Sequence, residues 1–196
     1  MSYHTSVSSV LESAERTLEV AELGWRDYRQ GGERRWAGLV NAVVSARSTT
    51  NVLQNLRGLV PAYDEWWTRE REVLNNPVAQ WFVNVRNAIE KQGVLGNTDR
   101  VIAVHSFNAG LWSALEAAQP RGTIRTIIGD DLGRNAWVVA LPDGSTHKVY
   151  FSLPAENVDH YFEIENAPGG RRIEELYPQY FDQVKGLVEK AKREFS

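Results

Sequence analysis

Apolar residues recur at three- and four-residue spacing through the first part of the chain, which is the period of an amphipathic helix. The first such stretch runs from an N-cap at Ser8 or Ser9 to the break at Gly31 and Gly32. The pattern resumes at Trp36 and continues to Gly58. It therefore predicts two long helices, and the second is the more apolar.

Two shorter helices follow, separated by Asn75, Asn76 and Pro77. A third helix, charged on its outer face, opens at Tyr63 and ends at this Asn-Asn-Pro signal. Pro77 suits the first turn of a fourth helix, which Gly93 ends. Four helices with short connections predict a bundle.

The second half of the chain mixes strand and helix patterns. The runs rich in β-forming residues are residues 101–107, 123–128, 137–141 and 147–151. The last two are joined by Pro-Asp-Gly-Ser, a connection of hairpin type, so we expect a small antiparallel sheet packed on the bundle. A short helix is expected over residues 111–118, and an amphipathic helix over residues 173–195.

Together these elements predict a mainly α fold of the α+β kind, a bundle of four to five helices with a small antiparallel β-hairpin or sheet before the C-terminal helix. No internal repeat or low-complexity linker divides the 196 residues, so we predict a single domain, residues 1–196. Within it, residues 1–93 form the bundle core, residues 94–170 the mixed region, and residues 171–196 a helix that packs on the bundle.

Composition narrows the function. With 42% hydrophobic and 24% charged residues the chain is globular, and it has neither a long apolar run nor a signal-peptide pattern, so we expect a cytoplasmic protein without membrane contact. Zero cysteines exclude disulfides, thiolate metal sites and cysteine nucleophiles. The four histidines share no helical ligand spacing, and no nucleotide-binding fingerprint is present, so we expect no metal and no cofactor.

The fourth helix carries a cluster of polar residues: Arg86, Asn87, Glu90 and Lys91. Arg86 and Glu90 are four residues apart, as are Asn87 and Lys91, so each pair shares a helix face. Such a cluster can grip a phosphate. The alternative is a surface ion pair between Arg86 and Glu90, with Lys91 interacting with the helix dipole.

Arg47 interrupts the apolar second helix and continues the line of Val40, Val43 and Val44. Its long side chain either reaches solvent or pairs with a buried carboxylate. The carboxylates that could pair with Arg47 are Glu90, Asp64 and Glu65. If Arg47 instead met Arg86 and Lys91 across the bundle, the three cations would form an anion site.

Residues 46–54, 63–67 and 85–93 resemble uncharacterised bacterial proteins that are similar to the HEPN superfamily. The resemblance implies a small helical bundle, often a homodimer, acting in toxin-antitoxin or other defence systems. Many members of that superfamily are metal-independent endoribonucleases. Their motif is an Arg, usually followed by a polar residue, and then a His after four to six residues.

By this resemblance Arg86 and Asn87 match the opening of the motif, and Lys91, Gln92 or Gly93 stands where the His is expected. An unperturbed Lys holds its proton too tightly at neutral pH to act as the base, although it can stabilise phosphate charge. The resemblance thus implies a catalytic set of Arg86, Asn87 and Lys91, with Arg47 and Glu90 binding substrate.

Two functions from different classes follow. The first is a HEPN-like homodimer that binds or cleaves RNA, with Arg86 and its mate across the two-fold axis facing one phosphate. The second is a non-catalytic helical module for protein interaction or dimerisation, in which the same cluster fixes helix packing. An open positive cleft at Arg86 favours RNA, and a dry Arg86–Glu90 pair favours the module.

Overall fold

The computed structural model describes residues 6–93, 98–104, 109–130, 134–154 and 158–196. The helices are α1 (Val7–Gln30), α2 (Arg35–Leu53), α3 (Tyr63–Glu70), α4 (Pro77–Gln92), α5 (Ala109–Ala118) and α6 (Ile173–Phe195). Short 3-10 turns are η1 (Gly32–Arg34), η2 (Gln54–Gly58), η3 (Arg71–Leu74) and η4 (Pro168–Gly170). The strands are β1 (Thr98–Val104), β2 (Thr123–Ile127), β3 (Asn135–Ala140), β4 (Thr146–Phe151) and β5 (Val158–Ile164).

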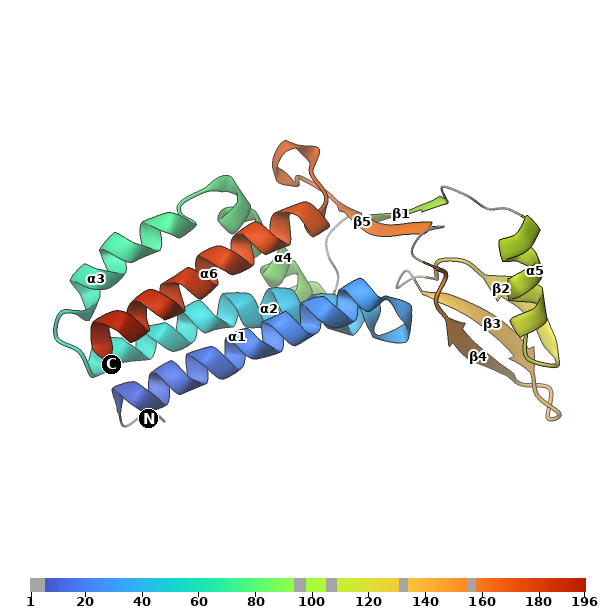
Figure 1. The fold of residues 1–196 in the computed structure, drawn as a ribbon, viewed down its shortest axis with the longest axis horizontal. Coiled ribbons are helices and arrows are strands. Elements are labelled where there is room, and N and C mark those ends of the chain that lie inside the picture. Colours follow the sequence, from blue (N-terminus) through green and yellow to red (C-terminus); the bar gives the residue numbers. More distant parts are fainter. Residues whose placement is uncertain (1–5, 94–97, 105–108, 131–133, 155–157) are drawn as a thin grey trace.

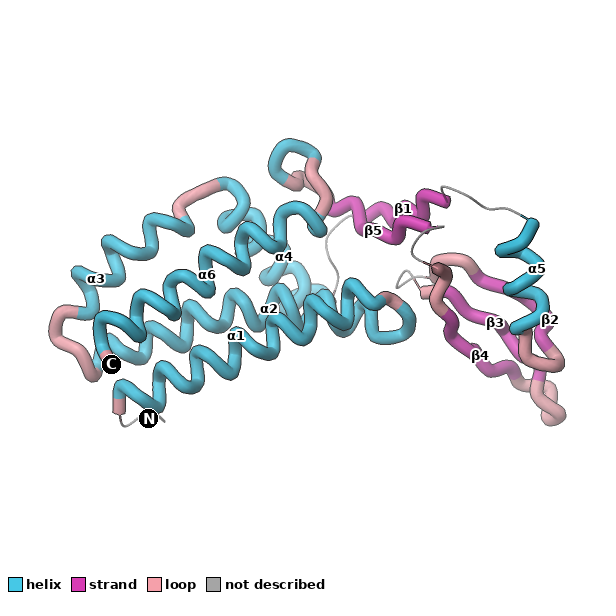
Figure 2. Tube along the Cα trace, viewed as in Figure 1, coloured by secondary structure: helices cyan, strands magenta, loops and turns pink. Residues whose placement is uncertain are grey.

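The long helices lie side by side at one end of the molecule, and α5 and the strands β2, β3 and β4 lie at the other (Figure 1). Figure 2 shows the two-stranded ribbon of β1 and β5 between these regions. The predicted fold class is confirmed, because the protein is mainly α with a small antiparallel sheet before the C-terminal helix.

Helix ends largely follow the predicted signals. The N-cap of α4 is Asn76, whose Oδ1 accepts from the backbone N–H of Ala79 at 3.0 Å, and Gly93 ends the helix with a φ of 69°. The predicted cap of α1 at Ser8 or Ser9 is wrong. Ser6 caps α1 instead, because Ser6 and Ser9 form a capping box in which each side chain accepts from the other's backbone N–H.

α1 and α2 pack against each other more closely than ordinary side chains permit. A Cβ atom on Gly24 would lie 2.6 Å from the Ala42 nitrogen, and one on Gly38 would lie 2.5 Å from the Tyr28 nitrogen. The two glycines therefore allow the backbones to meet. The α1–α2 pair forms a base: α4 packs against α2, and α6 packs against both helices.

α6 packs on this base through its predicted apolar face. The Tyr177 hydroxyl donates to the carbonyls of Ala21 and Ala42 at 3.3 and 3.1 Å, so it ties α6 to both α1 and α2. The Tyr180 ring stacks on Phe82 of α4 with centroids 4.6 Å apart. α6 therefore contacts α1 and α2 through Tyr177 and α4 through Tyr180.

The strands form two separate antiparallel sheets. β3 lies between β2 and β4, as the hairpin and the third strand predicted, and α5 shares a small core with this sheet through Leu111, Leu115, Trp137 and Leu153. β1 pairs with β5, which the sequence pattern did not identify. The predicted strand over residues 101–107 is β1, shifted toward the N-terminus, and residues 105–107 lie outside the described residues.

Across the part of the chain that the structure describes, every helix is too short or too polar to cross a bilayer.

Candidate functional site

The predicted cluster on α4 is paired within its own helix. Arg86 Nη1 lies 2.7 Å from Glu90 Oε2 and donates to Asn87 Oδ1 at 3.1 Å. The Arg86 side chain is 25% exposed. Its charge is therefore balanced by Glu90 one turn further along, as the ion-pair alternative expects.

Lys91 lies exposed in the last turn of α4, close to the negative end of the helix dipole. Arg47 lies on α2, where its Nη1 donates to Thr50 Oγ1 and, at 3.1 Å, to Asn51 Oδ1. Of the carboxylates considered as its partners, Glu90 pairs with Arg86 and Asp64 with Arg57. Among the described residues, Arg47 has no carboxylate partner.

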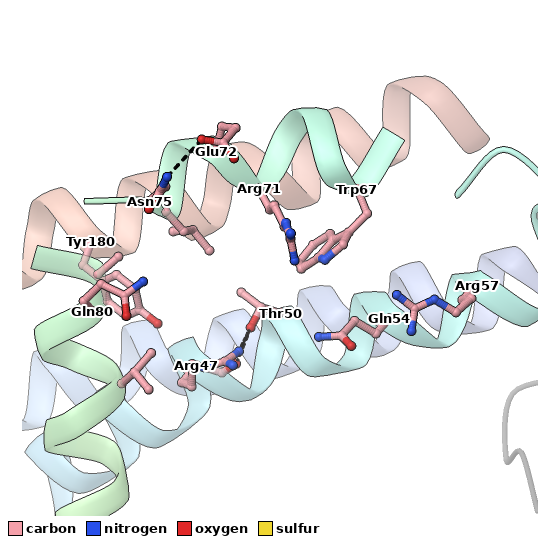
Figure 3. A pocket seen from close by; sticks show the side chains of 13 residues that line it. Arg47, Thr50, Gln54, Arg57, Trp67, Arg71, Glu72, Asn75, Gln80 and Tyr180 are labelled. Atoms are coloured by element: carbon pink, nitrogen blue, oxygen red, sulfur yellow. Dashed lines mark hydrogen bonds between the residues drawn. The ribbon is translucent and has the colours of Figure 1, made fainter. Parts of the chain in front are cut away.

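Arg47 opens onto a cavity of about 460 Å³, which we call the arginine cavity. Its cationic lining residues are Arg47, Arg57 and Arg71, and its other principal polar lining residues are Gln54, Glu72 and Tyr180. Figure 3 shows α2 and η2 on one side of this cavity and the α3–η3 segment on the other. None of Arg86, Asn87, Glu90 and Lys91 lines it. Arg47 therefore lies beside Arg57 and Arg71, and not beside the Arg86 and Lys91 that the sequence suggested.

Local sequence signals determine where the segments that line this cavity begin and end. α2 tightens into η2, which ends at Gly58, and the chain then turns so that α3 begins at Tyr63. Pro61 lies in the connection and stops the helix from continuing. At the far end, Asn76 caps α4 and closes the connection from η3. The side chain of Arg71 on η3 is thereby placed opposite α2 (Figure 3).

The lining carries more positive than negative charge. Arg57 Nε pairs with Asp64 Oδ1 at 2.7 Å in an exposed ion pair, so its charge is compensated. Arg71 forms no ion pair with any residue that the structure describes. Glu72 is the carboxylate in the lining, and it accepts from Asn75 Nδ2 at 3.2 Å. Arg47 and Arg71 are therefore two guanidinium groups that can receive an anion.

Tyr180 reaches the cavity from α6 and is 1% exposed. Its hydroxyl has no hydrogen-bond partner among the described residues. Burial raises the pKa of Tyr180 to about 12, and the nearby charge of Arg47 acts in the opposite direction. The neutral hydroxyl is therefore available to donate to a bound group at neutral pH.

A second polar cluster lies where α1, α2 and α6 meet β5. The Tyr28 hydroxyl donates to Glu174 Oε1, and Arg35 Nη2 lies 3.4 Å from that hydroxyl and 3.8 Å from Glu174 Oε1. The Arg35 guanidinium also lies over the Tyr28 and Phe162 rings, at 4.6 and 5.7 Å from their centroids. The pKa of Tyr28 is raised well above its ordinary value by burial and by Glu174. We call this group the Arg35 cluster, and its internal pairing indicates a structural role.

Sequence reasoning identified Arg47 but missed the residues that share its cavity. Tyr180 lies on the apolar stripe of α6, a position that predicts a core residue. Arg71 lies in a charged segment whose outer face was expected to be solvated. A tyrosine within an apolar stripe is a weak signal, because most such hydroxyls find a partner in the protein.

Residues 11–110 match the sequence family described as bacteriophage lambda protein ea47. No curated protein and no solved structure matches the chain. The matched segment runs from α1 into α5 and contains Arg47, Arg71 and Arg86, whereas Tyr180 lies beyond it. Since the match covers 100 of the 196 residues, the chain belongs to the family of bacteriophage lambda protein ea47.

Proposed function

We propose that this protein is a HEPN-like RNA-binding protein that holds a phosphate group of RNA in the arginine cavity without cleaving the chain. The observation that carries the proposal is the placement of Arg47 and Arg71 around one cavity of about 460 Å³. Neither has a carboxylate partner among the described residues. Guanidinium groups in this state bind phosphate oxygens through charge-assisted hydrogen bonds.

Binding without cleavage fits the state of the α4 cluster. Arg86 already contacts Glu90 and Asn87 through Nη1, so its charge is balanced before any ligand arrives. Lys91, Gln92 or Gly93 stands where the HEPN motif would have the histidine that acts as acid or base. Without that histidine, the α4 cluster lacks the residue that the motif uses to activate the ribose hydroxyl. The homodimer and the defence or toxin-antitoxin setting implied by the resemblance belong to the same proposal.

The test is fluorescence anisotropy of a short single-stranded RNA labelled at its 3′ end and phosphorylated at its 5′ end, titrated in EDTA. We expect the Arg47→Ala, Arg71→Ala double variant to bind at least about tenfold more weakly, with a shallower salt dependence. An Arg69→Ala, Arg193→Ala variant is the control, because both side chains are exposed and outside the cavity lining. Equal losses in the two variants, or no binding by the natural sequence, would overturn the proposal.

The same samples test cleavage on a denaturing gel. We expect intact RNA after prolonged incubation. Product that appears with the natural sequence and disappears with Arg86→Ala would show that the α4 cluster is catalytic, and it would replace the proposal of binding alone.

The pairing of Arg86 with Glu90 favours a second candidate, a helical module for protein interaction or dimerisation. In this case RNA would not bind, and the purified protein would form a defined oligomer. Light scattering after size-exclusion chromatography, performed on the natural sequence and on Arg86→Ala, tests whether the cluster fixes an interface.

A further inference from the structure

Three hydrogen-bond donors from three different elements surround the arginine cavity. Arg47 comes from α2, Arg71 from η3 and Tyr180 from α6. In Figure 3, Tyr180 and Gln80 lie at one end of the cavity and Arg57 at the other, with Arg47 and Arg71 between them. The site is thus not a flat row of surface cations, because one of its donors comes from the buried face of the C-terminal helix.

The Tyr180 hydroxyl is the feature that points to a ligand. The residue is 1% exposed, and its oxygen has no partner in the described part of the chain. Buried hydroxyls are rarely left unpaired, because burial removes the water molecules that would otherwise bond to them. Three residues earlier on the same helix, the Tyr177 hydroxyl has two carbonyl acceptors. Tyr63 also has a buried hydroxyl without a partner in the described part of the chain, but only Tyr180 of the two lines the arginine cavity. A group that enters the cavity can therefore supply the partner of Tyr180.

Charge and geometry indicate which group that is. A terminal phosphate monoester carries three acceptor oxygens and a charge close to −2 at neutral pH, whereas an internal phosphodiester offers two free oxygens and a charge of −1. Two uncompensated guanidiniums and one neutral hydroxyl match the first group in both charge and number of acceptors. Arg47, Arg71 and Glu72 together carry a net positive charge, so a doubly charged group gains more Coulomb energy in this cavity than a singly charged one, and Glu72 reduces the gain for both.

We infer that the arginine cavity binds the terminal phosphate monoester of an RNA chain, with Arg47 and Arg71 pairing with its charge and Tyr180 donating a hydrogen bond to it. This inference rests on the proposed function and names the part of RNA that the site recognises. The cavity volume of about 460 Å³ lies within the range of small-ligand sites and suits an end nucleotide. The side-chain amides of Gln54 and Gln80 in the same lining can bond to its sugar or base.

The experiment compares one RNA sequence, labelled internally, with a 5′-phosphate, with a 3′-phosphate, and with hydroxyls at both ends. We expect a phosphorylated end to raise the affinity by about tenfold or more, and the preferred end to be the one that enters the cavity. Adenosine 5′-monophosphate should compete with the phosphorylated RNA. Tyr180→Phe should remove most of the difference between phosphorylated and hydroxyl-ended RNA.

Tyr177→Phe is the matched control. It removes a hydroxyl from the same helix, but one that already has acceptors in the protein. We expect Tyr177→Phe to lower the melting temperature and keep the preference for a phosphorylated end. Tyr180→Phe should instead keep or raise the melting temperature and lose the preference, a separation that a purely structural role for Tyr180 would not produce.

The outcomes separate this inference from the proposed function. If all three RNAs bind equally and the Arg47→Ala, Arg71→Ala variant weakens them all, RNA binding stands and the terminal-phosphate inference is wrong. If no RNA binds but adenosine 5′-monophosphate binds and Tyr180→Phe abolishes this binding, the monoester site stands and its ligand is a free nucleotide. If neither RNA nor the mononucleotide binds, both proposals fail.

Discussion

The arginine cavity and the Arg35 cluster contain the same residue types in different roles. Each combines an arginine, a buried tyrosine and a glutamate from elements far apart in the sequence. In the Arg35 cluster the tyrosine hydroxyl and the guanidinium both contact Glu174. In the cavity the Tyr180 hydroxyl has no partner among the described residues, and the Glu72 carboxylate bonds to Asn75 instead. Glu174 Oε2 is also buried without a partner among the described residues, so the difference lies in the cations: Arg35 faces a carboxylate of its own cluster, and Arg47 does not.

The largest effect is expected from Arg35→Ala. It leaves Glu174 and Tyr28 without the cation that they surround, so we expect the free energy of unfolding to fall by about 3 kcal/mol in urea denaturation. Arg34→Ala is the control, because the Arg34 side chain is 71% exposed, whereas that of Arg35 is 9% exposed. Arg34→Ala should cost less than about 1 kcal/mol. Similar losses from both variants would contradict the structural role of the Arg35 cluster.

The two tyrosines give the next largest contrast. Tyr28→Phe removes a hydrogen bond to a buried carboxylate, and we expect a loss of about 2 kcal/mol in the free energy of unfolding. Tyr180→Phe removes a buried hydroxyl that has no partner among the described residues, so stability should stay the same or rise by up to about 1 kcal/mol. A large loss from Tyr180→Phe would mean that its hydroxyl is already satisfied in the free protein.

Alkaline pH provides a third comparison. Because burial raises the pKa of Tyr180 from 10.0 to about 12, its neutral form is favoured in the folded state. This contribution to stability is fully present below pH 10 and is lost as the pH rises from about 10 to about 12. Near pH 11 the loss is about 1.4 kcal/mol for this residue. Urea titrations at mildly and strongly alkaline pH should show a smaller pH-dependent loss for Tyr180→Phe than for the natural sequence.

The smallest effect concerns Glu72, the carboxylate in the cavity lining. Glu72→Gln keeps the side-chain shape and removes a charge that repels anions, so RNA affinity should rise about two- to fivefold. Glu65→Gln removes a charge from an exposed position outside the lining and should change little. A lower affinity for Glu72→Gln in anisotropy would indicate that the carboxylate itself contacts the ligand.

Local sequence signals predicted most of the helical half. Capping residues, glycines and Pro77 act over a few residues, and α4 begins and ends where these signals lie. The third helix begins at Tyr63 as predicted, but α3 ends at Glu70 and η3 fills the stretch before the Asn-Asn-Pro signal. The strand β5 was missed because its partner is β1, more than fifty residues earlier, and no turn joins the two. Long-range pairing of this kind leaves only a weak local pattern.

The candidate site was predicted only through Arg47. Arg86 and Glu90 are four residues apart, so helix geometry alone predicted their pairing, and the structure contains it. Arg71 and Tyr180 meet Arg47 only through the packing of η3 and α6 around α2. No spacing along the chain encodes that arrangement, and an unpaired hydroxyl becomes visible only when its neighbours are known.

The ribbon of β1 and β5 brings the two ends of the segment between its strands close together. Thr98 pairs with Ile164 at one end of the ribbon and Val104 with Val158 at the other, so the chain enters and leaves the segment between the strands at neighbouring positions. Replacing residues 105–157 by an Asn-Gly turn would convert the ribbon into an ordinary hairpin, and the helical bundle with its arginine cavity would keep all of its own residues. The ribbon therefore marks the place at which this segment can be exchanged, and the contact between β4 and η1 is what the bundle would lose.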